Sequence, residues 1–142
     1  MLTITDLAVT FPSRLGDVNA LADVDMTIHP GEIHGLVGES GAGKSTVGAA
    51  VIGLLPTPGY IAKGTLTLGD TTLRNLSPQQ AHAIRGDRIS MIFQDPQTSL
   101  NPLMTIEDQL IETIQAHADV STRTARQRAV DLLEEILSLI HI

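Results

Sequence analysis

Apolar and polar residues alternate with a period of two in two runs near the N-terminus, residues 2–10 and 20–28. A period of two places every second side chain on the same face of a β-strand. Residues 12–19, between the two runs, are rich in turn formers. We therefore expect an antiparallel pair of strands at the edge of a sheet, and a second β region at residues 64–73.

Two further runs are apolar without alternation, which is typical of strands buried on both faces of a parallel sheet. Residues 33–37, IHGLV, lead into glycines, and residues 88–93, RISMIF, end at Gln94. Between them, residues 45–55 are small or aliphatic and predict a buried helix that Pro56 and Pro58 stop. The order of strand, glycine loop, helix and strand predicts an α/β fold.

Helix-capping signals predict three more helices. Ser77, with Pro78 after it and Gln80 three residues on, forms the pattern of a capping box for a helix to about residue 85. Thr105 can cap a helix that ends near His117, and Ser121 can cap another. One face of the last helix is apolar and consists of Ala125, Ala129, Leu132, Leu133, Ile136, Leu137 and Ile140.

The glycine loop is the clearest chemical signal in the chain. Residues 38–45, GESGAGKS, fit the pattern G-x-x-x-x-G-K-[ST] of a phosphate-binding loop. Glycines let backbone N–H groups turn towards an anion, Lys44 adds a positive charge, and the Ser45 hydroxyl can bind Mg²⁺. The residues that we assign to binding of ATP or a close relative are Gly38, Ser40, Gly41, Ala42, Gly43, Lys44, Ser45 and Thr46, with Lys44 also catalytic. The alternative is a glycine-rich turn that matches by chance, but the strand before it and the helix after it favour the site.

Composition and charge exclude several other functions. The net charge is −7, and the chain has only two lysines, Lys44 and Lys63, whereas a nucleic-acid surface needs clustered basic residues. Without cysteine, neither a disulfide nor a thiolate metal site can form. The five histidines show no metal-binding spacing, and the longest apolar run, residues 47–55, is far shorter than the roughly 20 residues that cross a bilayer. Any membrane role must therefore act through a partner.

A second motif carries a resemblance to a known family. Residues 91–96, MIFQDP, followed by QTSLNP at 97–102, resemble the Q-loop region of ATP-binding subunits of ABC transporters, in particular the oligopeptide, dipeptide and nickel group. The linker GLLP at 53–56, with Pro58-Gly59 and Gly64 after it, is similar to the same group. The resemblance covers about residues 1–137.

The resemblance implies a P-loop NTPase-type core, with an incomplete parallel sheet and an antiparallel β subdomain, in residues 1–93. It implies a Q-loop and the start of a helical subdomain in residues 94–142. The implied function is an importer subunit that couples ATP binding and hydrolysis to uptake of peptides or a similar small solute. Its implied partners are permease subunits and a second ATP-binding subunit, at the cytoplasmic face of the membrane without insertion.

Two more site residues follow from this resemblance. Gln94 would lie at the sheet edge where α/β folds bind ligands, and its side-chain oxygen can reach Mg²⁺ or orient the attacking water. The prolines Pro96 and Pro102 would keep the following loop extended. Phe11 closes the first strand where the family places an aromatic that stacks on adenine. The alternatives are a surface-loop glutamine and a core or hairpin phenylalanine.

Other features of the family pattern are missing. The last glycine is Gly86, so no glycine-containing signature lies after it, and no apolar strand ends in Asp-Glu. His141 is only faintly similar to the switch histidine. We therefore expect an N-terminal fragment of a longer ATPase that binds ATP without turnover. A small P-loop kinase and a non-catalytic ATP-binding module are the alternative functions.

Overall fold

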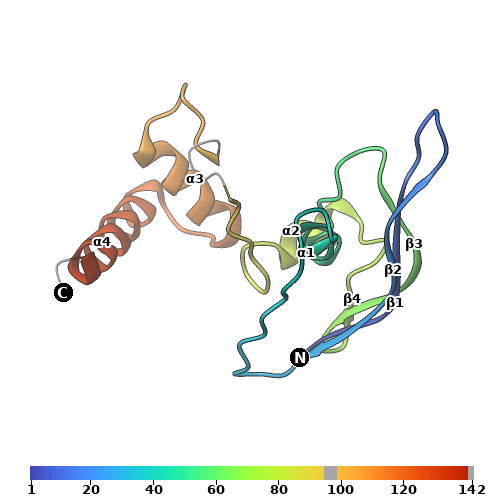
Figure 1. The fold of residues 1–142 in the computed structure, drawn as a ribbon. Coiled ribbons are helices and arrows are strands. Elements are labelled where there is room, and N and C mark those ends of the chain that lie inside the picture. The colour runs from blue at the N-terminus through green and yellow to red at the C-terminus, as the bar shows by residue number, and fades with distance from the viewer. Residues whose placement is uncertain (95–98, 141–142) are drawn as a thin grey trace. The chain divides into compact units, whose positions relative to one another are not determined.

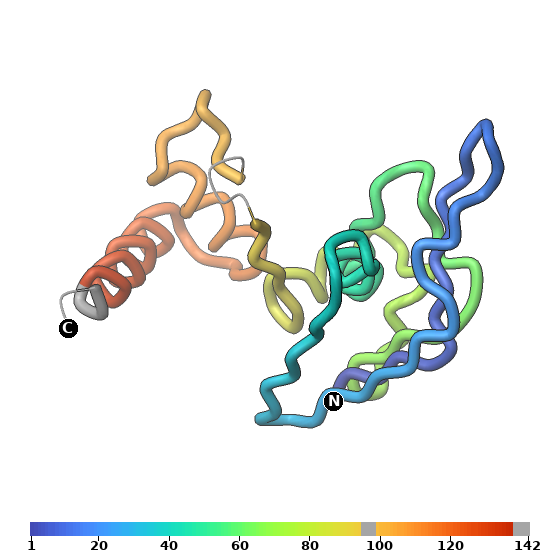
Figure 2. The backbone as a smooth tube through the Cα atoms, in the orientation of Figure 1, coloured from blue at the N-terminus to red at the C-terminus, as the bar shows by residue number. Residues whose placement is uncertain are grey.

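The computed structural model describes residues 1–94 and 99–140. The chain folds into two compact units, Met1–Met91 and Ile92–Ile142. Figures 1 and 2 trace both units from the N-terminus to the C-terminus. Of the residues discussed above, residues 95–98 and His141 lie outside the described residues, as does the side chain of Ile140.

The first unit is built on a four-stranded sheet in the order β2-β1-β3-β4. Its strands are β1 (Leu2–Phe11), β2 (Val18–Ile28), β3 (Tyr60–Leu68) and β4 (Thr71–Thr72), and every neighbouring pair is antiparallel. The alternating runs therefore form the expected strands. One face of the sheet carries the core residues Ile4, Leu7, Val9, Leu21 and Leu66.

An irregularity crosses the centre of the sheet. The pairing of β1 with both neighbours shifts near Asp6, whose φ is +53°, and Asp23 on β2 has a φ of +51°. Lys63 on β3 contacts both carboxylates, at 2.8 Å from Asp6 and 3.5 Å from Asp23. Aspartate tolerates the left-handed backbone better than most residues, which explains this choice at two bulged positions.

Helix α1 (Lys44–Ile52) packs its buried residues Val47, Ala50 and Val51 into the same core. The predicted helix to residue 55 was too long, because Gly53 adopts a left-handed φ of +69° and ends α1 before the prolines are reached. Arg85 completes this end by donating to the carbonyls of Ile52, at 2.8 Å, and Gly53, at 2.7 Å.

Helix α2 (Pro78–Ile84) begins as the capping box predicts. The Ser77 hydroxyl accepts from the Gln80 backbone N–H at 3.3 Å, and the Gln80 side chain accepts from the Ser77 N–H at 2.9 Å. Its buried residues Ala81 and Ile84 face inward, and α1 and α2 lie on the same side of the sheet (Figure 1). The helix therefore closes the core that α1 begins.

The second unit contains α3 (Ile106–His117) and α4 (Thr122–Ile140). Thr105 caps α3 by accepting from the Asp108 N–H at 3.1 Å, and the Ser121 hydroxyl accepts from the Thr124 N–H at 3.2 Å, as expected. Ala125 and Ala129 are buried, but four larger residues of the predicted apolar face are exposed: Leu132, Leu133, Ile136 and Leu137.

The parallel part of the expected sheet is absent from the described residues. Residues 33–37 form no strand, and residues 88–93 contribute only an isolated parallel bridge between Arg85 and Ile89. A strand exists only where a neighbour supplies a hydrogen-bond ladder, and no described segment does so here. The fold is thus mixed α/β with an antiparallel sheet.

Candidate functional site

The glycine loop joins the extended segment 33–37 to α1, and its shape depends on two glycines in the left-handed region. Gly41 and Gly43 both have a φ of +84°. Residues with a Cβ atom adopt this conformation at a cost of about 1–2 kcal/mol. The backbone therefore turns at the two glycines of residues 41–44, GAGK.

Gly43 meets a second requirement that the sequence motif does not reveal. A Cβ atom at this position would lie 2.6 Å from the Leu21 side chain and 2.8 Å from the backbone oxygen of Ala20. At Gly41 the same added atom would meet nothing within 4 Å. Close packing on β2 thus holds the end of the loop, and with it the start of α1, against the sheet.

The N-terminus of α1 is prepared for an anion. Gly43 is its N-cap residue, no side chain caps the helix, and no acidic residue lies in the first turn. The first N–H groups of a helix have no partner within the helix, and the helix dipole places partial positive charge there. With the turning loop before it, this end can accept a phosphate group through backbone N–H groups.

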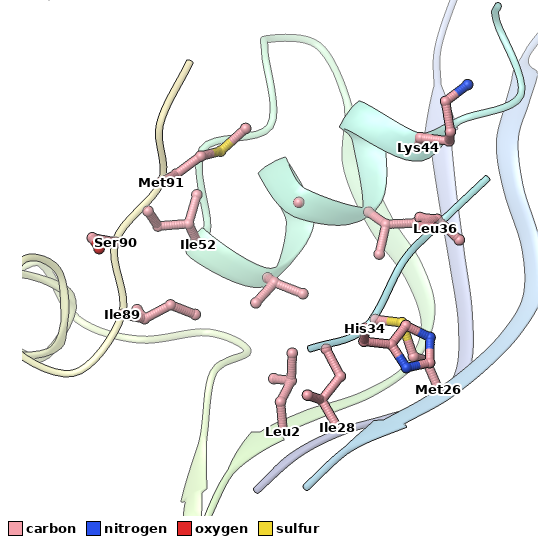
Figure 3. Close-up of a pocket in the computed structure, with 13 residues that line it drawn as sticks. Leu2, Met26, Ile28, His34, Leu36, Lys44, Ile52, Ile89, Ser90 and Met91 are labelled. Carbon is pink, nitrogen blue, oxygen red and sulfur yellow. The ribbon is translucent and has the colours of Figure 1, made fainter. Parts of the chain in front are cut away.

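Lys44 folds over the loop that precedes it. Its ammonium donates to the backbone oxygens of Gly38, at 2.9 Å, and Glu39, at 2.6 Å. Figure 3 shows the amine directed away from the neighbouring apolar pocket. The lysine therefore holds its positive charge at the loop, where a phosphate oxygen can replace one of these carbonyls.

Ser45 is exposed in the first turn of α1, directly after this lysine. A hydroxyl in that place fits the oxygen ligands that Mg²⁺ prefers, together with phosphate oxygens and water. The residues present therefore fit a magnesium nucleotide. Thr46 is half-buried and Ser40 and Ala42 are exposed, as suits a loop whose backbone binds the ligand.

The segment before the loop carries a small polar cluster. The backbone N–H of His29 donates to the Glu32 carboxylate at 2.7 Å, and the His34 ring lies 3.2 Å from its other oxygen. The His29 N–H, followed by His34, lowers the pKa of the Glu32 carboxyl from its ordinary value. These contacts order the turn that leads towards the loop.

Two predicted site residues remain, Phe11 and Gln94. Phe11 is half-buried at the end of β1, and its ring packs on Gly59, where a Cβ atom would lie 2.4 Å from the ring. Its stacking on adenine stays a prediction. Gln94 is exposed and belongs to the second unit, so its role at Mg²⁺ or the attacking water also stays a prediction.

Beside the loop lies an apolar pocket of about 270 Å³ that sequence reasoning missed. Its walls come from the sheet, from α1 and from the segments around residues 34–36 and 89–91 (Figure 3). The apolar runs 33–37 and 88–93 were the only sequence signal near it, since both supply residues to its walls. Among the described residues, no helix is long and apolar enough to cross a membrane, and no cluster of metal-binding side chains occurs.

Comparisons with known proteins identify the family of the chain. The sequence pattern of the ABC transporter family matches residues 21–140. The chain is 44% identical to the probable D,D-dipeptide transport ATP-binding protein DdpD of Escherichia coli, over 96% of this chain and 42% of that protein. It is 42% identical to the oligopeptide transport ATP-binding protein OppD of Salmonella typhimurium, over 96% of this chain and 40% of that protein. The chain thus spans about two fifths of the length of these relatives.

A solved structure shows the same fold. The dimeric bacterial ABC transporter cassette MJ0796 matches 94% of this chain and 56% of its own, with a TM-score of 0.79 and 25% identity. The same cassette bound to ADP and Pi matches with a TM-score of 0.77. Because the family pattern covers most of the sequence and the relatives and the fold agree with it, the chain belongs to the family of ABC transporter ATP-binding domains.

Proposed function

We propose that this chain is the nucleotide-binding part of an importer for peptides or a similar small solute. The observation that carries the proposal is the uncapped N-terminus of α1 behind a loop with two left-handed glycines and a lysine folded over it. The peptide substrate is proposed from the names of DdpD and OppD. The family match favours this function over the small kinase.

Bound ATP would lie with its phosphates against the loop. Backbone N–H groups from Gly41 to Ser45 would surround the β- and γ-phosphates, and the Lys44 ammonium would move from the Glu39 carbonyl to a phosphate oxygen. Mg²⁺, held through Ser45 and the phosphates, would neutralise charge on the leaving phosphates. The loop's contribution is thus positioning and electrostatic stabilisation.

Gln94 and Phe11 complete the proposed site. Gln94 would contact Mg²⁺ or the attacking water and report nucleotide occupancy through the loop that follows it. Phe11 would offer one face of its ring to adenine, since a flat ring can stack without hydrogen bonds. Both roles come from the family resemblance.

The proposed partners are transmembrane permease subunits and a second ATP-binding subunit. The MJ0796 cassette is dimeric in its solved structure. The chain would act at the cytoplasmic face of the membrane, bound to the permease and not inserted. Hydrolysis would then require a partner or segment that supplies a glycine-containing signature, since residues 87–142 contain no glycine.

The two lysines of the chain provide the test. Lys44→Ala should weaken binding of a fluorescent ATP analogue with Mg²⁺ by at least about tenfold, because a charge-assisted contact to phosphate is lost. Lys63→Ala is the matched control, since it removes the same charge from an exposed residue on β3. Equal binding by the Lys44 variant and the wild-type chain would contradict a phosphate role for the loop.

A further inference from the structure

A second cavity lies at the C-terminal end of α1, at the other end of the helix from the phosphate loop. Its volume is about 360 Å³, which falls in the range of small-molecule sites, about 300–1,000 Å³. Gly53 lines it together with the start of β3 and residues 73–76. Helix α1 has nine residues, so at a rise of about 1.5 Å per residue more than about 10 Å of helix separates the cavity from the loop. The cavity is therefore distinct from the proposed ATP site.

Two arginines on the cavity wall carry positive charge that no described carboxylate neutralises. Arg74 donates to the backbone carbonyls of Gly64, at 2.9 Å, and Ile61, at 3.1 Å. Arg85 donates only to the carbonyls at the end of α1. Among the described residues, no carboxylate oxygen lies within 4.0 Å of either guanidinium. No described residue that lines the cavity is acidic, although the chain has a net charge of −7.

Both guanidiniums keep N–H donors for a ligand. An arginine side chain has five such donors, and two from each guanidinium bond to backbone carbonyls. Arg74 and Arg85 are half-buried, and a charge that is partly removed from water attracts an opposite charge more strongly than a fully exposed one does. The carbonyls also hold the two groups in place, so an anion that binds them has little side-chain freedom to remove.

The remaining walls suit an organic ligand with one charged end. Tyr60 and Asn75, whose side chains carry a hydroxyl and an amide, line the cavity, and so do the apolar residues Leu55, Leu73 and Leu76. Small-molecule sites typically combine apolar walls with a few polar groups that fix the orientation of the ligand. The cavity has both components within the first unit of the chain.

We propose that this cavity binds a small organic anion, with phosphate or carboxylate oxygens on Arg74 and Arg85 and an apolar body against the leucines. Guanidinium groups bind both kinds of oxyanion through paired N–H···O hydrogen bonds. Capping of carbonyls accounts for two donors of each arginine, and the anion accounts for the charge and the donors that remain. The proposal does not depend on the transport function, because it uses no residue of the phosphate loop.

The test is a titration of the ¹⁵N-labelled 142-residue chain followed by NMR. The probes are phenyl phosphate, benzoate and the uncharged benzyl alcohol. We expect saturable shifts of the amides at Gly53 and at residues 60–61 and 73–76 with the anions, and at least about tenfold weaker binding of benzyl alcohol. Binding of only one anion supports the proposal and identifies the anionic group. Equal binding of benzyl alcohol, or shifts confined to residues 38–46, would overturn it.

Asn75→Asp makes the test specific to the cavity. The variant adds a carboxylate to the wall and leaves both arginines in place, and aspartate tolerates the φ of +58° that the exposed Asn75 adopts. It should weaken anion binding by at least about tenfold and leave the urea midpoint unchanged. Asn101→Asp is the matched control, since it makes the same change of charge at an exposed residue outside the cavity. Anion binding unaffected by Asn75→Asp would overturn the proposal.

Binding of the fluorescent ATP analogue, measured on the same variants, separates this site from the phosphate loop. Asn75→Asp should bind the analogue like the wild-type chain, and Lys44→Ala should keep the shifts around the cavity. Loss of anion binding in Lys44→Ala would assign the anion to the loop and overturn the cavity site. Intact anion binding in a chain that does not bind the analogue would contradict the proposed function alone.

Discussion

Gly41 and Gly43 share a backbone conformation but not an environment. Both have a φ of +84°, yet only Gly43 lies against the Ala20 backbone and the Leu21 side chain. The motif predicts that both are glycine because an anion must approach the backbone closely. It does not predict that Gly43 also anchors α1 to β2, since that contact joins residues more than twenty positions apart.

The two glycines therefore give a matched pair of variants. Gly41→Ala should cost about 1–2 kcal/mol of unfolding free energy from backbone strain alone. Gly43→Ala should cost clearly more, because a Cβ atom there also overlaps the backbone oxygen of Ala20. Urea denaturation of both variants measures the difference. Equal losses would show that the contact with β2 does not constrain the loop.

The Asp6–Lys63 pair makes a prediction about pH. The hydrogen bond from Lys63 is the main cause that holds the pKa of Asp6 below its ordinary value of 3.8. A lowered folded-state pKa stabilises the fold above the unfolded-state value, and this stabilisation is lost as the pH falls through the folded-state value. The same contact raises the pKa of Lys63. The stabilisation that comes from Lys63 is therefore present below its ordinary pKa of 10.5 and is lost as the pH rises through the folded-state pKa.

Asp6→Asn tests this linkage without disturbing the backbone, since asparagine also tolerates a positive φ. The variant should be slightly less stable than the wild-type chain near neutral pH, and the difference should vanish well below the ordinary pKa of Asp6. Urea midpoints across the acid range measure it. Asp17→Asn, an exposed residue of the β1–β2 turn, controls for the change in net charge. A difference that grows at low pH would contradict the assignment.

At the scale of elements, capping residues predicted helices well. Ser77 and Thr105 sit at the N-caps of α2 and α3 because each cap bonds to backbone only three residues away. The C-terminus of α1 was less predictable. Gly53 ends the helix, and Arg85, more than thirty positions along the chain, donates to its last carbonyls.

Arg85→Gln should therefore destabilise the first unit although the residue lies in a loop. It removes charge-assisted hydrogen bonds to the Ile52 and Gly53 carbonyls, with an expected loss of about 1–3 kcal/mol. Thermal and urea unfolding followed by circular dichroism measure it. The control is Arg123→Gln, which changes an exposed arginine on α4. If both arginine variants unfold at the same denaturant concentration, the hydrogen bonds from Arg85 to the end of α1 contribute nothing to stability.

The helix α4 shows the limit of periodicity at this scale. Its apolar residues share a face as predicted, but among those whose side chains the structure describes only Ala125 and Ala129 are buried. A helical period shows which side chains point the same way, not whether another element covers them. The apolar runs 33–37 and 88–93 were predicted as strands but form none, because their apolar pattern does not show whether a neighbouring strand is present.

At the scale of the whole molecule, we predict that ATP binding and ATP hydrolysis are separable in this chain. The loop, Lys44 and Ser45 lie within the chain, but residues 87–142 hold no glycine for a signature and no apolar strand ending in Asp-Glu. We predict that the isolated chain binds ATP and releases phosphate no faster than background. A phosphate-release assay measures this, and steady-state turnover that disappears in Lys44→Ala would contradict it.

The sequence alone determined the features that depend on neighbours within a few residues. The turn at Gly41 and Gly43, the caps of α2 and α3 and the alternation of β1 and β2 belong here, because turns, caps and strand faces are set by local backbone geometry. Tertiary structure decided the packing of Gly43 on β2, the Arg85 contact that ends α1, and the unpaired state of residues 33–37. These depend on contacts between distant residues, and a buried strand needs a partner that no local pattern can supply.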